Sequence, residues 1–157
     1  MDYKIREVRP EDLDHVTEVE KICFPAAEAA GRESFEERIR SFPESFLVAE
    51  ADGTIVGFIN GAVTDERTIC DEMFEDTGLH KKEGAYQSVF GLDVLPAYQK
   101  KGIAAALMKR LMETARERGR KGMILTCKER LIPYYSGFGY RILGFPGLST
   151  AALSGTI

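Results

Sequence analysis

The sequence predicts an α/β fold in which helices cover both faces of a mixed, mostly antiparallel central sheet. Apolar stretches of strand length alternate with segments in which apolar residues recur every three or four positions, as on one face of a helix. The Asp52-Gly53 pair between two apolar stretches is typical of an antiparallel hairpin. After residue 88 strands and helices alternate, which favours a mixed sheet over a purely antiparallel one.

The first half of the chain predicts strand, helix, helix and hairpin. Residues 3–8 alternate as a strand, and Pro10 begins a helix that runs to about Cys23. The apolar face of this helix is predicted to comprise Leu13, Val16, Val19 and Ile22. After a loop over 24–33, Ser34-Phe35-Glu36-Glu37 has the pattern of a capping box and predicts a second helix to about Phe42.

The middle of the chain predicts a hairpin followed by a long polar segment. Its strands are expected over residues 46–50 and 54–62. Residues 63–85 are irregular, with one helical turn expected near Asp71–Glu75. Loops of this length are uncommon in compact domains unless they are functional.

The second half predicts an apolar strand over 88–94, a turn at Pro96 and a helix from Gly102 to about Arg118. The apolar face of that helix comprises Ile103, Leu107, Met108, Leu111, Met112 and Ala115. A buried strand over 122–127, a short helix over 131–137 and a last strand over 140–143 complete the order.

Composition limits the possible functions. With 157 residues the chain is expected to form a single domain over residues 1–157. A net charge of −4 argues against general nucleic-acid binding, which depends on neutralising phosphates. No apolar run reaches the roughly 18 residues of a membrane span, and the first residues lack the apolar core of a secretion signal. We therefore expect a cytoplasmic protein without a membrane or nucleic-acid partner.

The cysteines give no indication of a metal site. Cys23, Cys70 and Cys127 are widely separated and odd in number. This spacing disfavours both a disulfide framework and a zinc site, so no metal is expected.

Lys100 and Lys101 are expected in the first turn of the helix that starts near Gly102. Cations there oppose the helix dipole and cost roughly 0.3–1 kcal/mol each when exposed. The cost disappears if a polyanion binds the free backbone N–H groups at this helix end. Gly102, lacking a Cβ, allows a ligand to approach the backbone closely. The pattern predicts a binding site for a pyrophosphate.

The segment Gln99-Lys100-Lys101-Gly102-Ile103-Ala104, with the preceding Val94-Leu95-Pro96, resembles the pyrophosphate loop of the GNAT superfamily of N-acetyltransferases. The order of predicted elements matches that superfamily along most of the chain. The resemblance implies the GNAT fold and acetyl-CoA as co-substrate. It implies that the pantetheine arm pairs with the backbone of Leu92, Asp93 and Val94. The pyrophosphate is then bound by Gln99, Lys100, Lys101, Gly102, Ile103, Ala104 and Ala105.

A narrower resemblance concerns the segment from Cys127 to Tyr140, which is similar to the arylalkylamine (serotonin-type) N-acetyltransferases. It implies that Tyr135 is the general acid that protonates the leaving thiolate. It also implies a small, arylalkyl primary amine as acceptor, which attacks the thioester directly in a ternary complex. The alternative is that Tyr135 is a core aromatic residue like its neighbours Tyr134, Phe138 and Tyr140.

The chain departs from that branch in its expected base and in its C-terminal segment. Ser88 and Phe90 occupy the positions of two histidines that help to remove protons from the amine. His80, Glu28 and Glu33 are the remaining candidates for a base. Few residues follow Gly144, so we expect the final strand of the family to be lost or shortened, with consequences for the acceptor pocket.

Two other functions stay open at this point. An acyl-CoA-binding sensor or pseudoenzyme is favoured by the missing histidines and the short C-terminal segment. A protein or peptide N-acetyltransferase would need an open peptide groove, for which the sequence gives no indication. The sequence leaves both monomer and homodimer possible, and it does not identify the acceptor.

Overall fold

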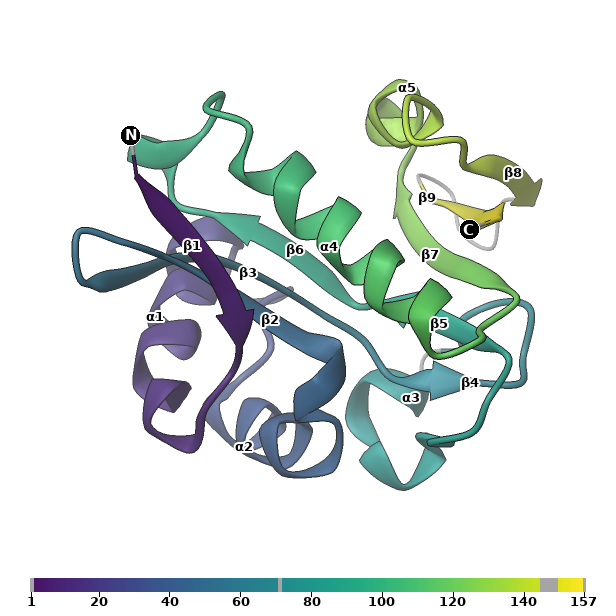
Figure 1. Ribbon diagram of the computed structural model, residues 1–157, viewed down its shortest axis with the longest axis horizontal. Helices are drawn as coiled ribbons and strands as arrows, with labels where there is room; N and C mark the ends of the chain where they lie inside the picture. The colour runs from purple at the N-terminus through teal and green to yellow at the C-terminus, as the bar shows by residue number, and fades with distance from the viewer. Residues whose placement is uncertain (1, 71, 145–149, 157) are drawn as a thin grey trace. The chain divides into compact units, whose positions relative to one another are not determined.

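The structure is a computed structural model that describes residues 2–70, 72–144 and 150–156. Its residues group into two compact units, which are described one at a time (Figure 1). The first unit comprises the chain up to Gly61 together with Gly91–Leu111, and the second comprises Ala62–Phe90 together with the chain from Met112.

The first unit contains a four-stranded antiparallel sheet in the order β1-β2-β3-β6. The strands are β1 (Tyr3–Glu7), β2 (Phe46–Ala51), β3 (Thr54–Asn60) and β6 (Gly91–Val94). The predicted hairpin is confirmed, because Asp52 and Gly53 join β2 to β3 with φ values of 54° and 76°. Two successive positive φ values are those of a type I′ turn, whose twist matches paired strands.

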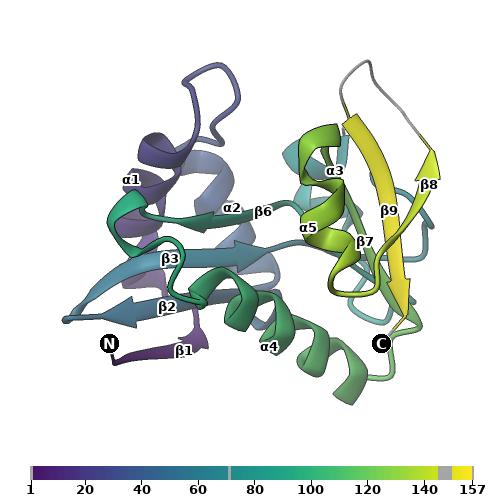
Figure 2. The same cartoon turned by 90° about the horizontal axis from the view of Figure 1, so that it is seen from above.

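The helices of this unit lie on both sides of its sheet. Helices α1 (Leu13–Cys23) and α2 (Arg32–Ser41) cover one side, and the N-terminal half of α4 (Ile103–Glu117) lies on the other (Figure 2). Short 3-10 turns η1 (Pro10–Asp12), η2 (Pro43–Ser45) and η4 (Pro96–Tyr98) each begin with proline. Proline suits a first helical position because no N–H is needed there.

Two details of the predicted helices are wrong. Helix α2 begins at Arg32 with Gly31 as its N-cap, so Ser34 lies inside the first turn and is not the cap of a capping box. Ile22 is 52% exposed, whereas Thr17 and Glu20 are buried beside Leu13 and Val16. The buried side of α1 is therefore rotated from the predicted one and carries polar groups.

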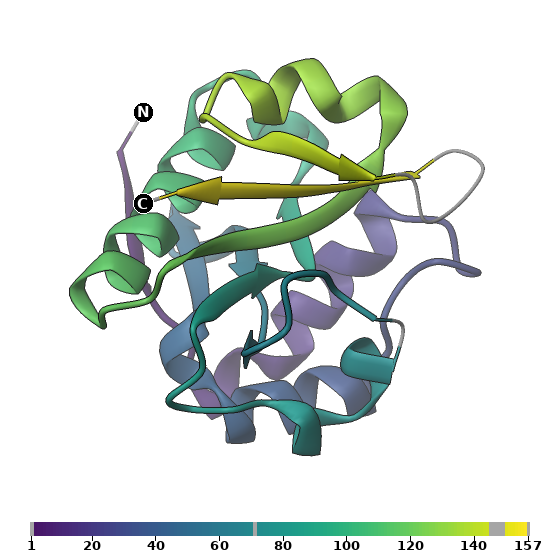
Figure 3. The ribbon, with the colours of Figure 1, turned by 90° about the vertical axis from the view of Figure 1, so that its right-hand side faces the viewer.

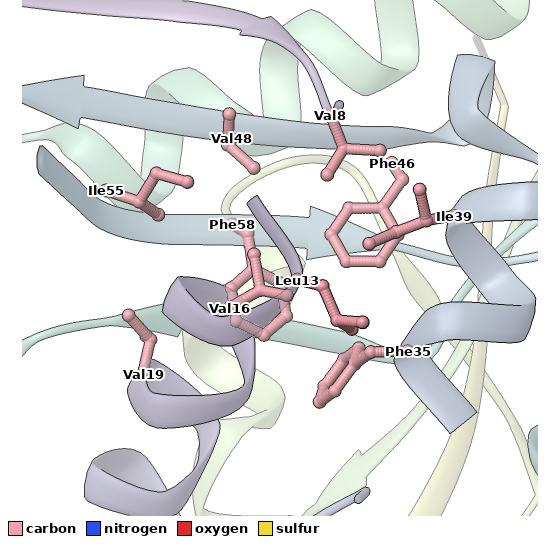
Figure 4. Close-up of a cluster of buried hydrophobic side chains, with 10 residues drawn as sticks. All are labelled: Val8, Leu13, Val16, Val19, Phe35, Ile39, Phe46, Val48, Ile55 and Phe58. Carbon is pink, nitrogen blue, oxygen red and sulfur yellow. The ribbon is translucent and has the colours of Figure 1, made fainter. Parts of the chain in front are cut away.

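A cluster of three phenylalanines forms the centre of the core between the sheet and these two helices (Figure 4). The ring centroids of Phe35, Phe46 and Phe58 lie 5.5–6.1 Å apart. Edge-on arrangements at such distances are the preferred geometry of aromatic pairs. The cluster is completed by Val8, Leu13, Val16, Val19, Ile39, Val48 and Ile55. This packing fixes α1 and α2 against the strands that lead to β6.

The second unit contains a five-stranded sheet in the order β4-β5-β7-β9-β8 (Figure 3). Its strands are β4 (Val63–Thr64), β5 (Tyr86–Val89), β7 (Gly122–Lys128), β8 (Arg141–Gly144) and β9 (Thr150–Thr156). Its helical elements are α3 (Glu72–Glu75), η3 (Thr77–Leu79), η5 (Glu129–Leu131) and α5 (Ile132–Ser136). Strands β5 and β7 are parallel, and the other pairs are antiparallel.

The mixed, mostly antiparallel character of the predicted fold is thus confirmed, with two corrections to its strands. The strand expected over 88–94 divides at Phe90, and its two parts, β5 and β6, pair in different sheets. The final strand, expected to be lost or shortened, is present as β9 and pairs with β7 along Gly122–Lys128. The helical turn expected near residues 71–75 is α3, although Asp71 lies outside the described residues. No helix of the described residues is long and apolar enough to cross a membrane.

Candidate active site

The predicted pyrophosphate loop has an unusual backbone. Lys100 and Lys101 precede α4, which begins at Ile103, so they are not in its first turn as predicted. Lys100 has a φ of 62° and Gly102 a φ of 85°. Only glycine adopts such values without strain, and a lysine there costs roughly 1–2 kcal/mol. The loop therefore contains a strained residue directly before the N-terminus of α4.

The loop leaves backbone donors and open space for an anion. A Cβ placed on Gly102 would meet no atom within 4 Å, so the space beside this residue is free. The first intrahelical bond joins Ala106 N–H to the Gly102 carbonyl, and the N–H groups of Ile103, Ala104 and Ala105 precede it. Left-handed residues near a helix start gather N–H groups into an anion-binding concavity. These residues therefore fit a pyrophosphate.

The Val94 carbonyl connects this loop to β6. It accepts hydrogen bonds from Gln99 Nε2 at 2.9 Å and from Cys23 Sγ at 3.4 Å. Gln99 was predicted to contact the pyrophosphate, but its side-chain amide donates to the strand. Burial, and then the charges of Asp93 and Glu20, raise the pKa of the Cys23 thiol to about 11, so the thiol keeps its proton at neutral pH.

Strand β6 lies at the edge of its sheet, which leaves one side of its backbone available. Leu95 N–H donates to the Val56 carbonyl at 2.8 Å, so by alternation Asp93 and Gly91 also direct their backbone groups toward β3. The backbone groups of Leu92 and Val94 are directed to the other side. The edge can pair with an extended ligand through Leu92 N–H, Leu92 C=O and Val94 N–H, since the Val94 carbonyl is already bonded.

A second hydrogen bond supports the loop from the hairpin. Tyr98 Oη donates to Asp52 Oδ2 at 3.1 Å and so connects η4 to the β2–β3 turn. This hydrogen bond is the main reason that the pKa of Tyr98 is raised. The start of the loop is thus held both by the turn and, through Gln99, by β6.

A group of buried polar side chains lies behind β6 and was not predicted from the sequence. Glu20, Arg38, Asn60 and Asp93 are all buried, and they come from α1, α2, β3 and β6. Asp93 alternates with Leu92 and Val94 along β6, and its side chain is buried with this group. Glu20 falls four residues after the buried Val16, and Arg38 falls three residues after the buried Phe35. That spacing was the available signal.

In the second unit, Tyr135 is part of an aromatic group on α5. It is partly buried, and its ring centroid lies 5.2 Å from that of Tyr134 and 6.1 Å from that of Tyr140. Tyr134 is 41% exposed, whereas Tyr140 is buried. Burial, and then the neighbouring Tyr135, raise the pKa of Tyr140. The three tyrosines therefore occupy three different environments.

The two positions that carry histidines in the arylalkylamine branch hold structural side chains in this chain. Ser88 is fully buried, and its hydroxyl donates to the Ala62 carbonyl at 2.6 Å. The Phe90 ring packs against Phe74 of α3, with centroids 4.6 Å apart. Neither residue provides a titratable group.

The other candidate bases have separate positions. His80 Nδ1 accepts the Val63 N–H at 3.0 Å, so this nitrogen caps the start of β4. Glu28 and Glu33 are exposed, in the α1–α2 loop and in the first turn of α2. Across the part of the chain that the structure describes, no three His, Cys, Asp or Glu side chains are arranged to bind a metal ion.

Comparisons with known proteins agree with this arrangement. The sequence model of the acetyltransferase (GNAT) family matches residues 13–140. A probable hydrolase, YhcX, from Bacillus subtilis is 28% identical over 77% of the chain, which spans only 25% of that protein. Serotonin N-acetyltransferase from Mesocricetus auratus is 25% identical over 96% of the chain and 73% of its own length. The GNAT-like decarboxylase GphF, solved with isobutyryl-CoA, superposes with a TM-score of 0.85 at 23% identity, over 98% of both chains.

Proposed function

This chain belongs to the acetyltransferase (GNAT) family, and we propose that it transfers the acetyl group of acetyl-CoA to the primary amine of a small arylalkyl acceptor. The observation that carries this proposal is the loop before α4, where Gly102 has a φ of 85° and leaves open space beside the free N–H groups of the helix start. A pyrophosphate is the ligand that this combination of shape and charge fits.

The edge of β6 supports a position for the rest of the cofactor. A pantetheine arm extended along β6 pairs with Leu92 and with the N–H of Val94. This N–H shares its peptide plane with the Asp93 carbonyl, which faces the paired strand β3, and so it keeps a fixed direction. A preorganised backbone donor stabilises the negative charge that develops on the thioester oxygen during attack.

The reaction needs one proton removed and one proton supplied. The amine nitrogen attacks the thioester carbon, the carbon–sulfur bond breaks, and the thiolate takes a proton. We assign that proton to the Tyr135 hydroxyl. With reference pKa values of about 10 for tyrosine and about 8.5 for a thiol, the transfer is uphill by about 2 kcal/mol in water, which a shared hydrogen bond offsets.

The amine loses its proton without a dedicated imidazole. An amine with a pKa of about 10.4 is unprotonated about once in 2,500 molecules at pH 7. Ser88 and Phe90 do not change this fraction, since the Ser88 hydroxyl donates to Ala62 and Phe90 is apolar. The free amine is therefore the reacting species, and the rate rises with pH until the amine is fully deprotonated.

One observation favours a second candidate, the decarboxylation of an acyl-CoA that carries a free carboxylate. One of the solved structures similar to this chain is a GNAT-like decarboxylase, and the stacked pair Phe74–Phe90 is apolar at a position where the arylalkylamine branch has a histidine. An apolar surface destabilises a carboxylate and so favours cleavage of its bond to the α-carbon, which releases carbon dioxide. The electron pair stays on the α-carbon, which then takes a proton from water. This reaction needs no amine and no base.

A single screen distinguishes these functions. Purified protein is incubated with acetyl-CoA and panels of arylalkylamines, polyamines and peptides, while released thiol is measured. A parallel incubation contains malonyl-CoA without an amine, and acetyl-CoA is measured as its product. We expect thiol release with phenylethylamine- or tryptamine-like amines and a lower rate with the other two panels.

Each other outcome points to a different function. Release with peptides alone indicates a peptide acetyltransferase, and acetyl-CoA formed from malonyl-CoA indicates the decarboxylase. Tight CoA binding without turnover on any panel indicates an acyl-CoA sensor.

A further inference from the structure

Four polar side chains from four different elements are buried together behind β6. Glu20 is 8% exposed, Arg38 4%, and Asn60 and Asp93 1% each. Groups that ionise are rarely buried to this extent without partners, because removal from water disfavours their charged forms. We call these four residues the buried polar cluster.

The hydrogen bonds of Asn60 fix the orientation of the cluster. Arg38 Nη1 donates to Asn60 Oδ1 at 3.1 Å, so Asn60 Nδ2 is directed away from Arg38 Nη1. A Cβ placed on Gly91 would lie 3.4 Å from Asp93 Oδ1 and 3.8 Å from Asn60 Nδ2. The amide of Asn60 and the carboxyl of Asp93 therefore both lie beside Gly91, the first residue of β6.

The carboxyl of Asp93 lies against the carboxyl of Glu20. No N–H or O–H group of the described residues donates to either oxygen of Asp93. Its hydrogen-bonding contact is with Glu20, and two carboxyls form a hydrogen bond only if one of them is protonated. Glu20 Oε2 already accepts the Ala30 N–H at 2.8 Å. Asp93 is 1% exposed and receives no donor from the described residues, so the shared proton is placed on Asp93.

The pKa values of Asp93 and Arg38 agree with this placement of the proton. Burial, and next the hydrogen bond with Glu20 and its charge, raise the pKa of Asp93 from 3.8 to about 10, against the opposing effect of Arg38. Burial lowers the pKa of Arg38 to about 10, and the charges of Glu20 and Asp93 oppose this change. At neutral pH Arg38 thus keeps its proton and Asp93 is neutral. The thiol of Cys23, which also faces Glu20 and Asp93, is uncharged as well.

We propose that Asp93 is a positioning residue, whose protonated carboxyl holds β6 to Glu20 and, through Glu20, fixes the α1–α2 loop at Ala30. This proposal rests on the proposed function, in which the β6 edge binds the pantetheine arm, and it places the acceptor beside the α1–α2 loop. Glu20 and Cys23 are three residues apart on the last turns of α1, and both bond to groups that flank this region. One proton thus joins the cofactor strand to the loop.

The sign of the pH dependence follows from the raised pKa of Asp93. The folded protein keeps this proton up to about pH 10, and the unfolded chain releases it above about pH 4. Stability due to this group therefore decreases as pH rises between these values. The unfolding equilibrium constant increases about tenfold per pH unit from this one proton. Asp93→Asn keeps a donor to Glu20 and has no proton to release.

The test compares Asp93→Asn with Asp93→Ala in the full chain. Between pH 5 and pH 9, the ratio of the unfolding constants of wild type and Asp93→Asn should grow by about tenfold per pH unit. Glu20→Gln, which supplies its own amide donor, should weaken the wild-type dependence, and the part due to burial of Asp93 should remain. Parallel profiles for wild type and both variants would show that no proton is shared and overturn the proposal.

A second measurement examines the loop. Hydrogen exchange of the Ala30 amide should accelerate at least tenfold in Asp93→Ala and stay near wild type in Asp93→Asn. The acceptor KM should rise about five- to tenfold in Asp93→Ala, with the Kd for CoA within twofold of wild type. Unchanged Ala30 exchange in folded Asp93→Ala would also overturn the proposal. Failure of the proposed function would abolish the KM readout alone, since exchange and pH dependence need no substrate.

Discussion

The side chain of Gln99 donates a 2.9 Å hydrogen bond to the backbone carbonyl of Val94, so the loop before α4 is attached to the edge strand β6. This bond fixes the distance between the two parts of the protein that we assign to one ligand, the pyrophosphate and the pantetheine arm. The position of the loop is therefore part of the site.

Loss of this bond should weaken CoA binding moderately. Gln99→Leu removes the donor at nearly constant side-chain volume. Since such a bond contributes about 0.5–1.5 kcal/mol, the Kd for CoA should rise about two- to tenfold in calorimetry. Gln99→Asn has a shorter side chain that does not reach the carbonyl, and it should behave like Gln99→Leu. Unchanged affinity in both variants would mean that the loop is positioned without Gln99.

A substitution at Gly102 tests the pyrophosphate site directly. Gly102→Asp adds bulk and a negative charge in the open space beside the loop, so CoA affinity should fall at least tenfold. The matched control is Gly119→Asp, because Gly119 also has a positive φ, of 75°, and no atom within 4 Å of an added Cβ. Both variants experience similar backbone strain, and only the first should lose affinity. Equal affinities would remove the basis for placing the pyrophosphate here.

Lys100 should affect stability and binding in opposite directions. Its φ of 62° is strained for lysine, and Lys100→Gly should raise the free energy of unfolding by about 0.5–1 kcal/mol after the added chain entropy is counted. CoA affinity should fall about two- to fivefold, because one exposed cation is lost. Lys101→Gly loses the same charge without relieving a positive φ, so affinity should fall and the added chain entropy should lower the free energy of unfolding. A destabilised Lys100→Gly would contradict this explanation.

The proposed acid is tested by adjacent tyrosines. Tyr135→Phe should lower kcat by roughly 10²–10⁴-fold, the usual contribution of general acid catalysis. CoA affinity should stay nearly constant, since the proton is transferred in the transition state. Tyr134→Phe removes a hydroxyl from the more exposed neighbour and should retain wild-type kcat. A greater loss of kcat in Tyr134→Phe would show that Tyr134, and not Tyr135, is the acid. No loss of kcat in either variant would show that water protonates the thiolate.

The elements predicted correctly are those with local signals. The Asp52-Gly53 turn and the apolar repeat of α4 depend on residues close in sequence, and both appear as expected. Strand β9 has few β-branched or aromatic residues, and its position is set by pairing with β7. The division at Phe90 was missed for the same reason, since it depends on which sheet each half of the segment joins.

In the candidate site, too, the features with local sequence signals were predicted, and those that depend on packing were not. The loop around Gly102 was predicted from a glycine and two lysines next to a helix start. Glu20 and Arg38 were not, because their buried positions result from the packing of α1 and α2 on the sheet. A charged residue at the spacing of an apolar face indicates such a cluster, but its partner, Asp93, lies far away in the sequence.

The most direct test of acetyl transfer follows the acetyl group itself. The protein is incubated with acetyl-CoA labelled with ¹³C in the acetyl group and with phenylethylamine, and the products are identified by mass spectrometry and NMR. We predict that the label appears in the amide of N-acetylphenylethylamine, at a rate that falls in Gly102→Asp and in Tyr135→Phe. Label that remains in the thioester, or that is found only in free acetate, would contradict the assignment of this chain as an amine acetyltransferase.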